Sequence, residues 1–403
     1  AYAHGLVNDD DTIPKGAATL AEQLRAAGYV TASIVANPFA GRTTGLDRGF
    51  DYVMEYPVVQ RHRTDAADRG TDSAAINRAI TPWIENRRGE PFFLFVLSTD
   101  PHAPYRPPAD LERKFGDPGD TAAFNRMYGK LRDIRAYGGG ATVTRAEMTA
   151  NGIAPESYIR SAMMRYDAEI AHNDRSIEQL LEKLKATGAL ENTLVVIASD
   201  HGEEFWEHGF GAHGHSLYRE LIRTFLLMWH PRLLPTPRRV AEPVQLTDVM
   251  PTVLELLSLG APERVQGQSL APLLKGQPFE RKDPMIPAKV ALPAARPGGG
   301  VPENLTDTFA RIDSFWKLIY RAQARRAGLK EIELYDRRAD PGEHDDVAAR
   351  HPEVSAKFKA EILRWMDGQR EFRKQLGPSG RTTIDTETLR RLRSLGYLGG
   401  KER

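Results

Sequence analysis

The segment of the sequence best suited to chemistry places a carboxylate beside an imidazole at the end of an apolar run. Residues 194–198 are all apolar, which predicts a strand buried on both faces, and Asp200, His201 and Gly202 follow after one serine. Ligands of open α/β sheets lie beyond the carboxyl ends of the strands. Because a carboxylate and an imidazole together suit a divalent cation, we predict Asp200 and His201 as metal ligands.

Histidines after this pair and in a second loop supply candidate proton donors. Three of them follow His201 within fourteen residues, namely His208, His213 and His215. His102 follows another apolar run, residues 92–97, in a loop rich in proline. An imidazole beside a bound ester can transfer a proton to a leaving oxygen. The structural alternative for His102 is a loop histidine that stacks on proline or on Tyr105, and His208 could be merely structural.

The order of these motifs resembles the metal-binding segment of the sulfatase family, within the alkaline phosphatase superfamily. The matching motifs are Ser199-Asp-His-Gly-Glu203, His208-Gly209, His213-Gly214 and Leu217-Tyr218-Arg219-Glu220. Similar stretches run along nearly the whole chain, among them Thr19-Leu-Ala-Glu-Gln-Leu24, Asp100-Pro-His102-Ala-Pro-Tyr105, Thr247-Asp248, Phe315-Trp316-Lys317 and Glu333-Leu-Tyr-Asp336. The resemblance implies a hydrolase of sulfuric esters.

The resemblance also implies roles for the candidate residues. Asp200 and His201 would bind one divalent ion. Calcium is the expected ion, and manganese or another transition metal stays open because imidazole is a softer donor than an amide oxygen. His102 would contact the sulfate oxygens and pass a proton to the leaving group. His213 would contact the bridging oxygen, with His215 as second choice. The substrate side would be formed by His208 and Asn37.

Two departures from the family pattern bear on activity. Sulfatases carry paired aspartates on an N-terminal strand and then a Cys or Ser, in Cys/Ser-x-Pro-x-Arg, that is oxidised to the formylglycine nucleophile. This sequence has no cysteine and no Ser-x-Pro-x-Arg, so it assigns no nucleophile. We therefore expect an N-terminally truncated and inactive chain. Ala36-Asn37-Pro38 stands where many sulfatases have Lys-x-His, which leaves Asn37 as the only donor there. Residues 9–11, three aspartates, are expected in a solvated loop.

The metal pair alone leaves other functions open. The same scaffold could act on phosphorus, as a phosphodiesterase, a phosphonate monoester hydrolase or a phosphoethanolamine transferase. A non-catalytic metal-binding fragment is an alternative of another class. The identity of the nucleophile would discriminate among these, since Thr favours phosphoryl transfer and Cys or Ser in the sulfatase motif favours sulfate.

Composition limits the partners. The 403 residues carry 55 basic and 54 acidic side chains, a net charge of +1, so no charge-driven attraction to nucleic acid is expected. No apolar run approaches the ~20 residues that span a bilayer, so no membrane segment is predicted in this chain. The predicted partner is a small-molecule or glycan sulfate ester. The resemblance favours a periplasmic or extracellular location.

Strands that alternate with helices predict an α/β fold with a mainly parallel, doubly wound sheet and a small C-terminal α+β subdomain. We expect the metallohydrolase domain, without its first strand and nucleophile, over residues 1–290 and the subdomain over 305–403. Expected helices cover residues 19–27, 73–86, 156–185, 248–260 and 351–366. Expected strands cover residues 30–36, 92–97, 194–198 and 225–229, with two more near 315–319 and 333–336.

Three further expectations concern other parts of the chain. The helix over 156–185 has an apolar face that is expected to pack inward: Ile159, Met163, Tyr166, Ile170, Ile177, Leu180, Leu181 and Leu184. Residues 110–155, with three glycines at 138–140, are expected to form an inserted loop region with one short helix around 122–131. Residues 389–395 are expected to form a short terminal helix.

Overall fold

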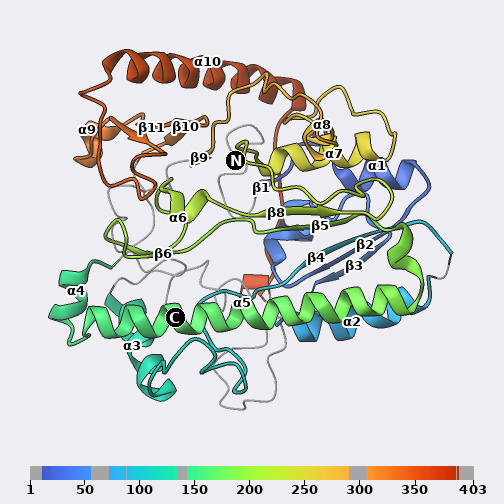
Figure 1. The fold of residues 1–403 in the computed structure, drawn as a ribbon, viewed down its shortest axis with the longest axis horizontal. Helices are drawn as coiled ribbons and strands as arrows, with labels where there is room; N and C mark the ends of the chain where they lie inside the picture. Colours follow the sequence, from blue (N-terminus) through green and yellow to red (C-terminus); the bar gives the residue numbers. More distant parts are fainter. Residues whose placement is uncertain are drawn as a thin grey trace. The chain divides into compact units, whose positions relative to one another are not determined.

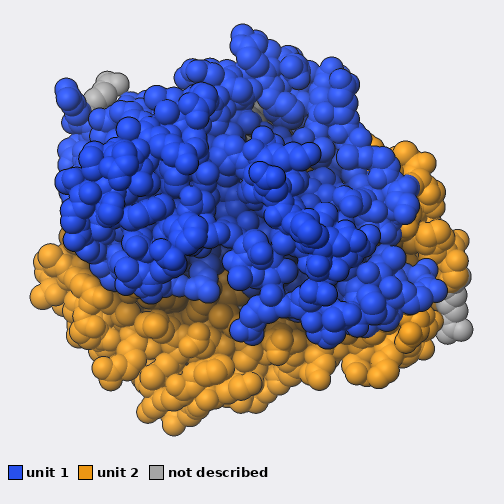
Figure 2. All heavy atoms as spheres, turned by 45° about the horizontal axis from the view of Figure 1, so that its top comes forward, with its two compact units in different colours: residues 1–20, 192–203, 213–381 blue, residues 21–191, 204–212, 382–403 orange. Residues whose placement is uncertain are grey.

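The computed structural model describes residues 11–55, 72–87, 89–134, 143–289, 306–386 and 388–389. The chain divides into two compact units, which Figure 2 colours separately. Unit 1 comprises residues 1–20, 192–203 and 213–381, and unit 2 comprises residues 21–191, 204–212 and 382–403. The predicted domain boundary falls at residues 290–305, outside the described residues, and stays a prediction.

A three-stranded parallel sheet forms the centre of unit 2. Strand β2 (Val30–Val35) lies between β3 (Tyr52–Glu55) and β4 (Phe92–Leu97) and is parallel to both. Helix α1 (Leu20–Ala26) and the pair formed by α2 (Ser73–Glu85) and α5 (Pro155–Ala186) flank these strands on opposite sides in Figure 1. Parallel strands covered on both faces are the arrangement predicted by the alternation of strands and helices.

Helix α2 begins where Asp72 caps it. The Asp72 side chain accepts a hydrogen bond from the Ala75 amide at 2.7 Å, and Pro82 lies inside the helix without ending it. The apolar side of α2 packs with α5 on the sheet in one core cluster, whose buried members are Ala32, Ile34, Ala36, Ile76, Ile80, Trp83, Ile84 and Leu184. This cluster fixes the carboxyl ends of β2 and β4, where the loops with Asn37 and His102 begin.

The inward face of α5 differs from the prediction. Ile159 and Leu184 are buried, but Met163 and Ile170 are 44% and 43% exposed. The buried positions include a polar stripe at helical spacing, made of Ser161, Arg165, Glu169, His172 and Ser176. This stripe is buried because neighbouring segments of unit 2 offer it partners, such as the Pro118 carbonyl, which accepts from the Ser161 hydroxyl at 2.5 Å. The apolar-face prediction is therefore wrong for Met163 and Ile170.

The expected loop region contains two helices. They are α3 (Thr121–Ile134), longer than predicted, and α4 (Arg145–Ala150), which was not predicted although Thr144 and Glu147 form a capping box at its start. Phe124 of α3 stacks on Tyr158 with ring centroids 5.2 Å apart. The glycines at 138–140 lie outside the described residues.

Unit 1 contains the strand that leads to the predicted metal ligands. Strand β5 (Val195–Ala198) pairs antiparallel with β8 (Leu226–Trp229). Its residues are half-buried and Ala198 is exposed, so the prediction of a strand buried on both faces is wrong. The reason is that β8 is the only strand that pairs with β5 in the part of the chain that the structure describes.

Short helices follow these strands in unit 1. They are α6 (Arg219–Ile222), α7 (Val249–Leu256) and α8 (Ala271–Leu274). Helix α7 begins directly after Asp248, as predicted, but ends before Gly260, because Ser258 adopts a φ of 57°. Within the described residues, 3-10 turns cover Pro38–Ala40, Arg42–Thr44, Ala189–Asn192 and Leu246–Asp248.

An antiparallel sheet with one long helix forms the C-terminal part of unit 1. Its strands, in sheet order, are β12 (Ile332–Asp336), β11 (Trp316–Arg321), β10 (Thr308–Ile312) and β9 (Ala288–Lys289). Helix α10 (Pro352–Leu376) packs on this sheet, as the helix at the top of Figure 1 shows, and the four-residue α9 (Ala324–Ala327) lies between β11 and β12. The predicted subdomain is thus present, with more strands and a longer helix than expected.

The described part of the N-terminus pairs with a distant strand. Strand β1 (Asp11–Thr12) is antiparallel to β13 (Gly380–Arg381), and Asp11 is buried. A solvated loop was therefore the wrong prediction for Asp11, since a partner 370 residues away is invisible to local sequence. Asp9, Asp10 and most of the predicted terminal helix lie outside the described residues. No helix in the described ranges is both long enough and apolar enough to cross a membrane.

Candidate functional site

Asp200 and His201 lie directly beyond the carboxyl end of β5. The His201 amide donates to Asp200 Oδ1 at 3.0 Å, and His201 Nδ1 lies 2.8 Å from the Gly202 carbonyl oxygen. Because a carbonyl only accepts, Nδ1 carries the ring proton and Nε2 is the ring atom with a lone pair. Nε2 lies 3.8 Å from Asp200 Oδ2, and both side chains are exposed. The two predicted ligands thus present one nitrogen and one oxygen donor together.

Gly202 allows the turn after these residues. A Cβ atom at position 202 would lie 2.0 Å from the Glu220 carbonyl oxygen, and the Gly202 amide donates to the Leu221 carbonyl at 2.8 Å. The backbone of α6 therefore packs against the Asp-His-Gly turn too closely for any side chain. This close approach explains why a glycine follows Asp200 and His201 in the motif.

His213 lies against this turn and is held by an acid. Its Nδ1 is 2.9 Å from Glu203 Oε1, and its ring centroid is 4.1 Å from that of His201. Burial alone would lower the pKa of His213, but the hydrogen bond to Glu203 and the charges of Glu203 and Asp200 outweigh it and raise that pKa. The Glu203–His213 pair therefore favours the protonated form of the His213 imidazole.

Glu203 was not predicted as a site residue. Its side chain is 4% exposed, and its role is to hold Nδ1 of His213. The sequence contained a signal, because an acid three residues after Asp200 belongs to the motif that matched. His215, the second choice for the proton donor, is buried with 1% exposure, whereas the His213 side chain keeps 15% exposed. This difference favours His213 over His215.

The loop after His215 is held by the C-terminal sheet within unit 1. The Arg219 amide donates to Glu343 Oε2 at 3.0 Å, and the Tyr218 hydroxyl donates to Glu333 Oε2 at 3.0 Å. Glu343 is itself paired with Lys317 of β11 at 2.5 Å, and both side chains of this pair are buried. Glu333 and Lys317 of the C-terminal sheet, with Glu343 of the loop after β12, thus fix the chain directly after His213 and His215.

His102 lies in unit 2, in the loop that follows β4. Its Nδ1 lies 2.8 Å from the Ala103 carbonyl oxygen. The backbone amides of His102 and Arg106 donate to the two carboxylate oxygens of Glu169 of α5, at 3.2 and 2.5 Å. The ring of Tyr105 packs against Tyr166 at 5.5 Å between centroids. Glu169, which contacts the candidate residue His102, was not predicted either.

The two predicted substrate-side residues also lie in unit 2. Asn37 caps a 3-10 turn, where its Oδ1 accepts from the Phe39 amide at 3.0 Å, so its carboxamide NH₂ is the group that can donate to a ligand. His208 lies in the turn between β6 (Glu204–Phe205) and β7 (Gly211–Ala212), and its amide donates to Glu204 Oε1 at 3.0 Å. The structure thus places Asp200, His201, His213 and His215 in unit 1, and Asn37, His102 and His208 in unit 2.

The donor set for a cation contains two side chains. Among the described residues, no group of three or more His, Cys, Asp or Glu side chains is arranged to hold a metal ion.

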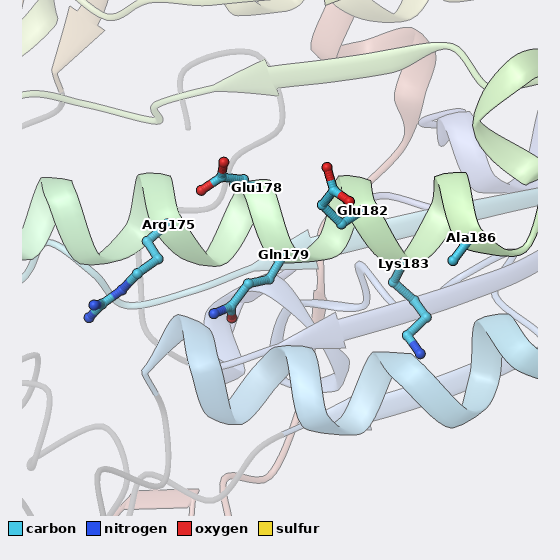
Figure 3. A pocket seen from close by; sticks show the side chains of 6 residues that line it. All are labelled: Arg175, Glu178, Gln179, Glu182, Lys183 and Ala186. Carbon is cyan, nitrogen blue, oxygen red and sulfur yellow. The ribbon is translucent and has the colours of Figure 1, made fainter.

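A shallow hollow on α5 contains none of the predicted site residues. It is lined by Arg175, Glu178, Gln179, Glu182, Lys183 and Ala186 (Figure 3), none of which is a predicted site residue. Two of its cations are already paired, Arg175 with Asp110 at 2.6 Å and Lys183 with Glu85 at 2.8 Å.

Comparison with known proteins shows which family the sequence matches. The model of the Sulfatase family matches residues 1–259. Arylsulfatase K of Xenopus laevis is 28% identical over 287 residues, which are 68% of this chain and 52% of that protein. The chain spans about half the length of the curated relatives it matches first.

Solved structures of related proteins share the fold. The phosphonate monoester hydrolase of Silicibacter pomeroyi superimposes with a TM-score of 0.70 at 20% identity, over 92% of this chain and 83% of that one. A protein solved in complex with its substrate D-glucosamine-2-N,6-O-disulfate superimposes with a TM-score of 0.63 at 20% identity, over 93% and 86% of the two chains. The fold is therefore the alkaline phosphatase-like α/β fold. Since the family model also covers more than half of its residues, this chain belongs to the sulfatase family.

Proposed function

We propose that this chain supplies the cation donors and the proton donor of a metal-dependent hydrolase of sulfuric esters. The observation that carries the proposal is the cluster beyond β5, in which the donors of Asp200 and His201 lie beside the Glu203–His213 pair. A pair of cation donors next to a proton donor is the combination that ester cleavage with a charged leaving oxygen requires.

Asp200 and His201 would hold the cation. Donors that share one ion lie about 2.0 to 2.4 Å from it, so two of them can be up to roughly 4 Å apart. The separation of 3.8 Å between His201 Nε2 and Asp200 Oδ2 fits that limit. A bound divalent ion would neutralise charge on the sulfuryl oxygens. Calcium is favoured by the family, and the imidazole donor keeps manganese or another transition metal open.

His213 would protonate the departing oxygen. Glu203 accepts from Nδ1, so a doubly protonated His213 carries its second proton on Nε2, from where it can pass to the leaving group. The buried carboxylate also keeps the ring in one orientation. His102 would stabilise charge on the sulfuryl oxygens, while Asn37 and His208 would contact the substrate and His215 would remain structural.

The proposed substrate is a sulfated sugar. It is supported by the similarity of the fold to a protein whose bound substrate is a disulfated glucosamine, and by a 27% identical relative named N-acetylglucosamine-6-O-sulfatase from Bacteroides thetaiotaomicron. A periplasmic or extracellular location, favoured by the family, is part of this proposal.

A phosphonate monoester hydrolase on the same scaffold is the second candidate. Ala36 and Pro38 are buried and carry no side-chain donor where many sulfatases have Lys and His, which weakens the expected sulfate pocket. The high TM-score to the Silicibacter enzyme concerns the fold alone.

Paired substrates test the proposal on the full-length encoded protein. An aryl sulfate and an aryl phosphonate with the same leaving group are compared with and without a chelator. We expect chelator-sensitive turnover with kcat/KM higher for the sulfate. A higher kcat/KM for the phosphonate would instead support the second candidate, and loss of neither activity with the chelator would contradict the role of a metal.

A further inference from the structure

We propose that Glu169 of α5 is a positioning residue for the His102 loop. The inference deepens the proposed function, because it rests on the role of His102 at the sulfuryl oxygens. A single carboxylate takes the backbone amides at both ends of the segment 102–106, so the loop and the imidazole that it carries are oriented from α5.

The two bonds hold opposite ends of a short segment. Glu169 Oε2 accepts from the His102 amide at 3.2 Å, and Oε1 accepts from the Arg106 amide at 2.5 Å. The Glu169 residue is 3% exposed. A buried carboxylate is strongly unfavourable unless donors reach it, and here two backbone donors do. Each carboxylate oxygen of Glu169 therefore holds one end of the segment 102–106.

The composition of the loop leaves it few other means of support. Residues 101, 104 and 107 are prolines, which have no amide hydrogen. In the stretch 101–107, the remaining amides belong to His102, Ala103, Tyr105 and Arg106, and Glu169 takes two of these four. A loop that cannot form its own backbone ladder depends on an outside acceptor.

The next turn of α5 anchors the start of the loop. Asn173 Nδ2 donates to the Asp100 carbonyl at 2.7 Å. The Asp100 carboxylate accepts from the amide and hydroxyl of Ser73, at 2.8 and 2.9 Å, which ties it to the start of α2. The buried ring of His172 lies between two carboxylates, with Nε2 3.8 Å from Asp72 and 3.9 Å from Asp100. Asn173, His172 and Glu169 of α5 thus contact the loop from Asp100 to Arg106.

The orientation of the His102 ring follows from that of the loop. Its Nδ1 is bound to the Ala103 carbonyl of the same loop, so the ring turns with the backbone. Glu169 fixes this backbone and touches no reacting atom. Its effect on turnover would therefore pass through His102.

Hydrogen exchange of the chain tests the contact without any activity. Glu169→Gln keeps the size of the side chain but has one carboxamide oxygen to accept both amides. We expect the peptide spanning residues 100–107 to exchange about tenfold faster at its protected amides, since a bond to a charged acceptor is lost or weakened. Glu178→Gln is the matched control, because Glu178 is exposed on the same helix (Figure 3) and its variant should leave this peptide unchanged.

The outcomes of this experiment are distinct. Unchanged exchange of the 100–107 peptide in a folded Glu169→Gln protein would overturn the inference. If that variant does not fold, Glu169→Asp keeps the charge but shortens the reach by one methylene, and the same acceleration is expected. If the peptide in a folded Glu169→Asp protein exchanges as slowly as in the parent, the inference is likewise contradicted.

A double-mutant cycle in the full-length protein tests the link to function. His102→Ala and Glu169→Gln should each lower kcat on an alkyl sulfate. The combined variant should fall no more than about twofold below His102→Ala, since Glu169 acts through His102. Losses that multiply would overturn the positioning role. If His102→Ala alone has no effect, the proposed role of His102 fails, and hydrogen exchange still decides the contact with Glu169.

Discussion

The two histidine loops are held in different ways. His213 in unit 1 is held through its ring, whose Nδ1 lies 2.9 Å from Glu203. His102 in unit 2 is held through its backbone, since Glu169 accepts amides on both sides of the loop and not the ring itself. A contact to the ring affects both orientation and proton affinity, whereas a contact to the backbone affects orientation alone. Substitutions of the two acids should therefore have different kinetic signatures.

The largest expected effect concerns the whole chain. Residues 1–403 by themselves should show no turnover of an aryl sulfate or of an aryl phosphate diester. The reason is that the family's covalent nucleophile is missing, since the sequence contains no cysteine and no Ser-x-Pro-x-Arg. The assay uses the purified chain with calcium and then with manganese. Metal-dependent turnover well above background would show that a residue of this chain serves as the nucleophile.

The next largest effect is expected at the cation donors. In the full-length protein, Asp200→Asn should lower kcat/KM by about a thousandfold, because several kcal/mol of charge stabilisation depend on a carboxylate that an amide cannot replace. Bound metal, measured by elemental analysis, should fall with it, and the melting temperature should stay close to that of the parent. Normal metal content in this variant would contradict the placement of the site beyond β5.

A smaller and substrate-dependent effect is expected for the proton donor. His213→Ala should lower kcat/KM about a hundredfold for an alkyl sulfate and less than tenfold for a nitrophenyl sulfate, since a good leaving group departs without a proton. The same comparison for His215→Ala serves as the control, because His215 is buried. Equal losses on both substrates for His213→Ala would mean that the residue is structural.

Glu203→Gln separates the two ways of holding a histidine. An amide can still orient the ring but cannot support a charged imidazole, so the raised pKa of His213 should fall toward its ordinary value. We expect a loss of about tenfold on the alkyl sulfate at neutral pH, smaller than for His213→Ala. Glu169→Gln should lower kcat without moving the pH profile. Identical pH profiles for the two variants would remove the distinction drawn between the loops.

The smallest effect is expected at the ion pair between Arg165 of α5 and Glu112, which serves the fold alone. Burial raises the pKa of Glu112, but hydrogen bonds from Thr121 and Arg165 and the charge of Arg165 outweigh it, so that pKa lies below its ordinary value. A carboxylate whose pKa is lowered by folding stabilises the folded chain at pH values above its ordinary pKa. This contribution is lost as the pH falls through the lowered pKa of the folded state. Urea unfolding at neutral and acidic pH should show a smaller acid-induced loss for Glu112→Gln than for the parent.

The strands and the turn that carries Asp200 and His201 could be predicted from the sequence because local patterns determine them. The run 92–97 coincides with β4, and the turn at Asp200 follows a strand, as the motif required. The polar stripe of α5 could not be predicted by apolar periodicity. Arg165, Glu169 and His172 have the spacing of one helix face, but charged residues at that spacing usually face solvent. Their burial depends on loops distant in sequence, which local patterns do not contain.

The buried pair of Lys317 and Glu343 matters for how variants are interpreted. Glu343 also accepts a hydrogen bond from the Arg219 amide, directly after the segment that carries His213 and His215 (the histidine segment). Loss of Glu343 would leave a buried lysine without its acid, at a cost of about 3 to 5 kcal/mol, and would release the histidine segment at the same time. In a screen for lost activity, substitutions here would be mistaken for defects in catalysis. Measuring the amount of folded protein beside activity separates folding defects from catalytic defects. The C-terminal sheet should therefore be kept whole when the protein is shortened by engineering.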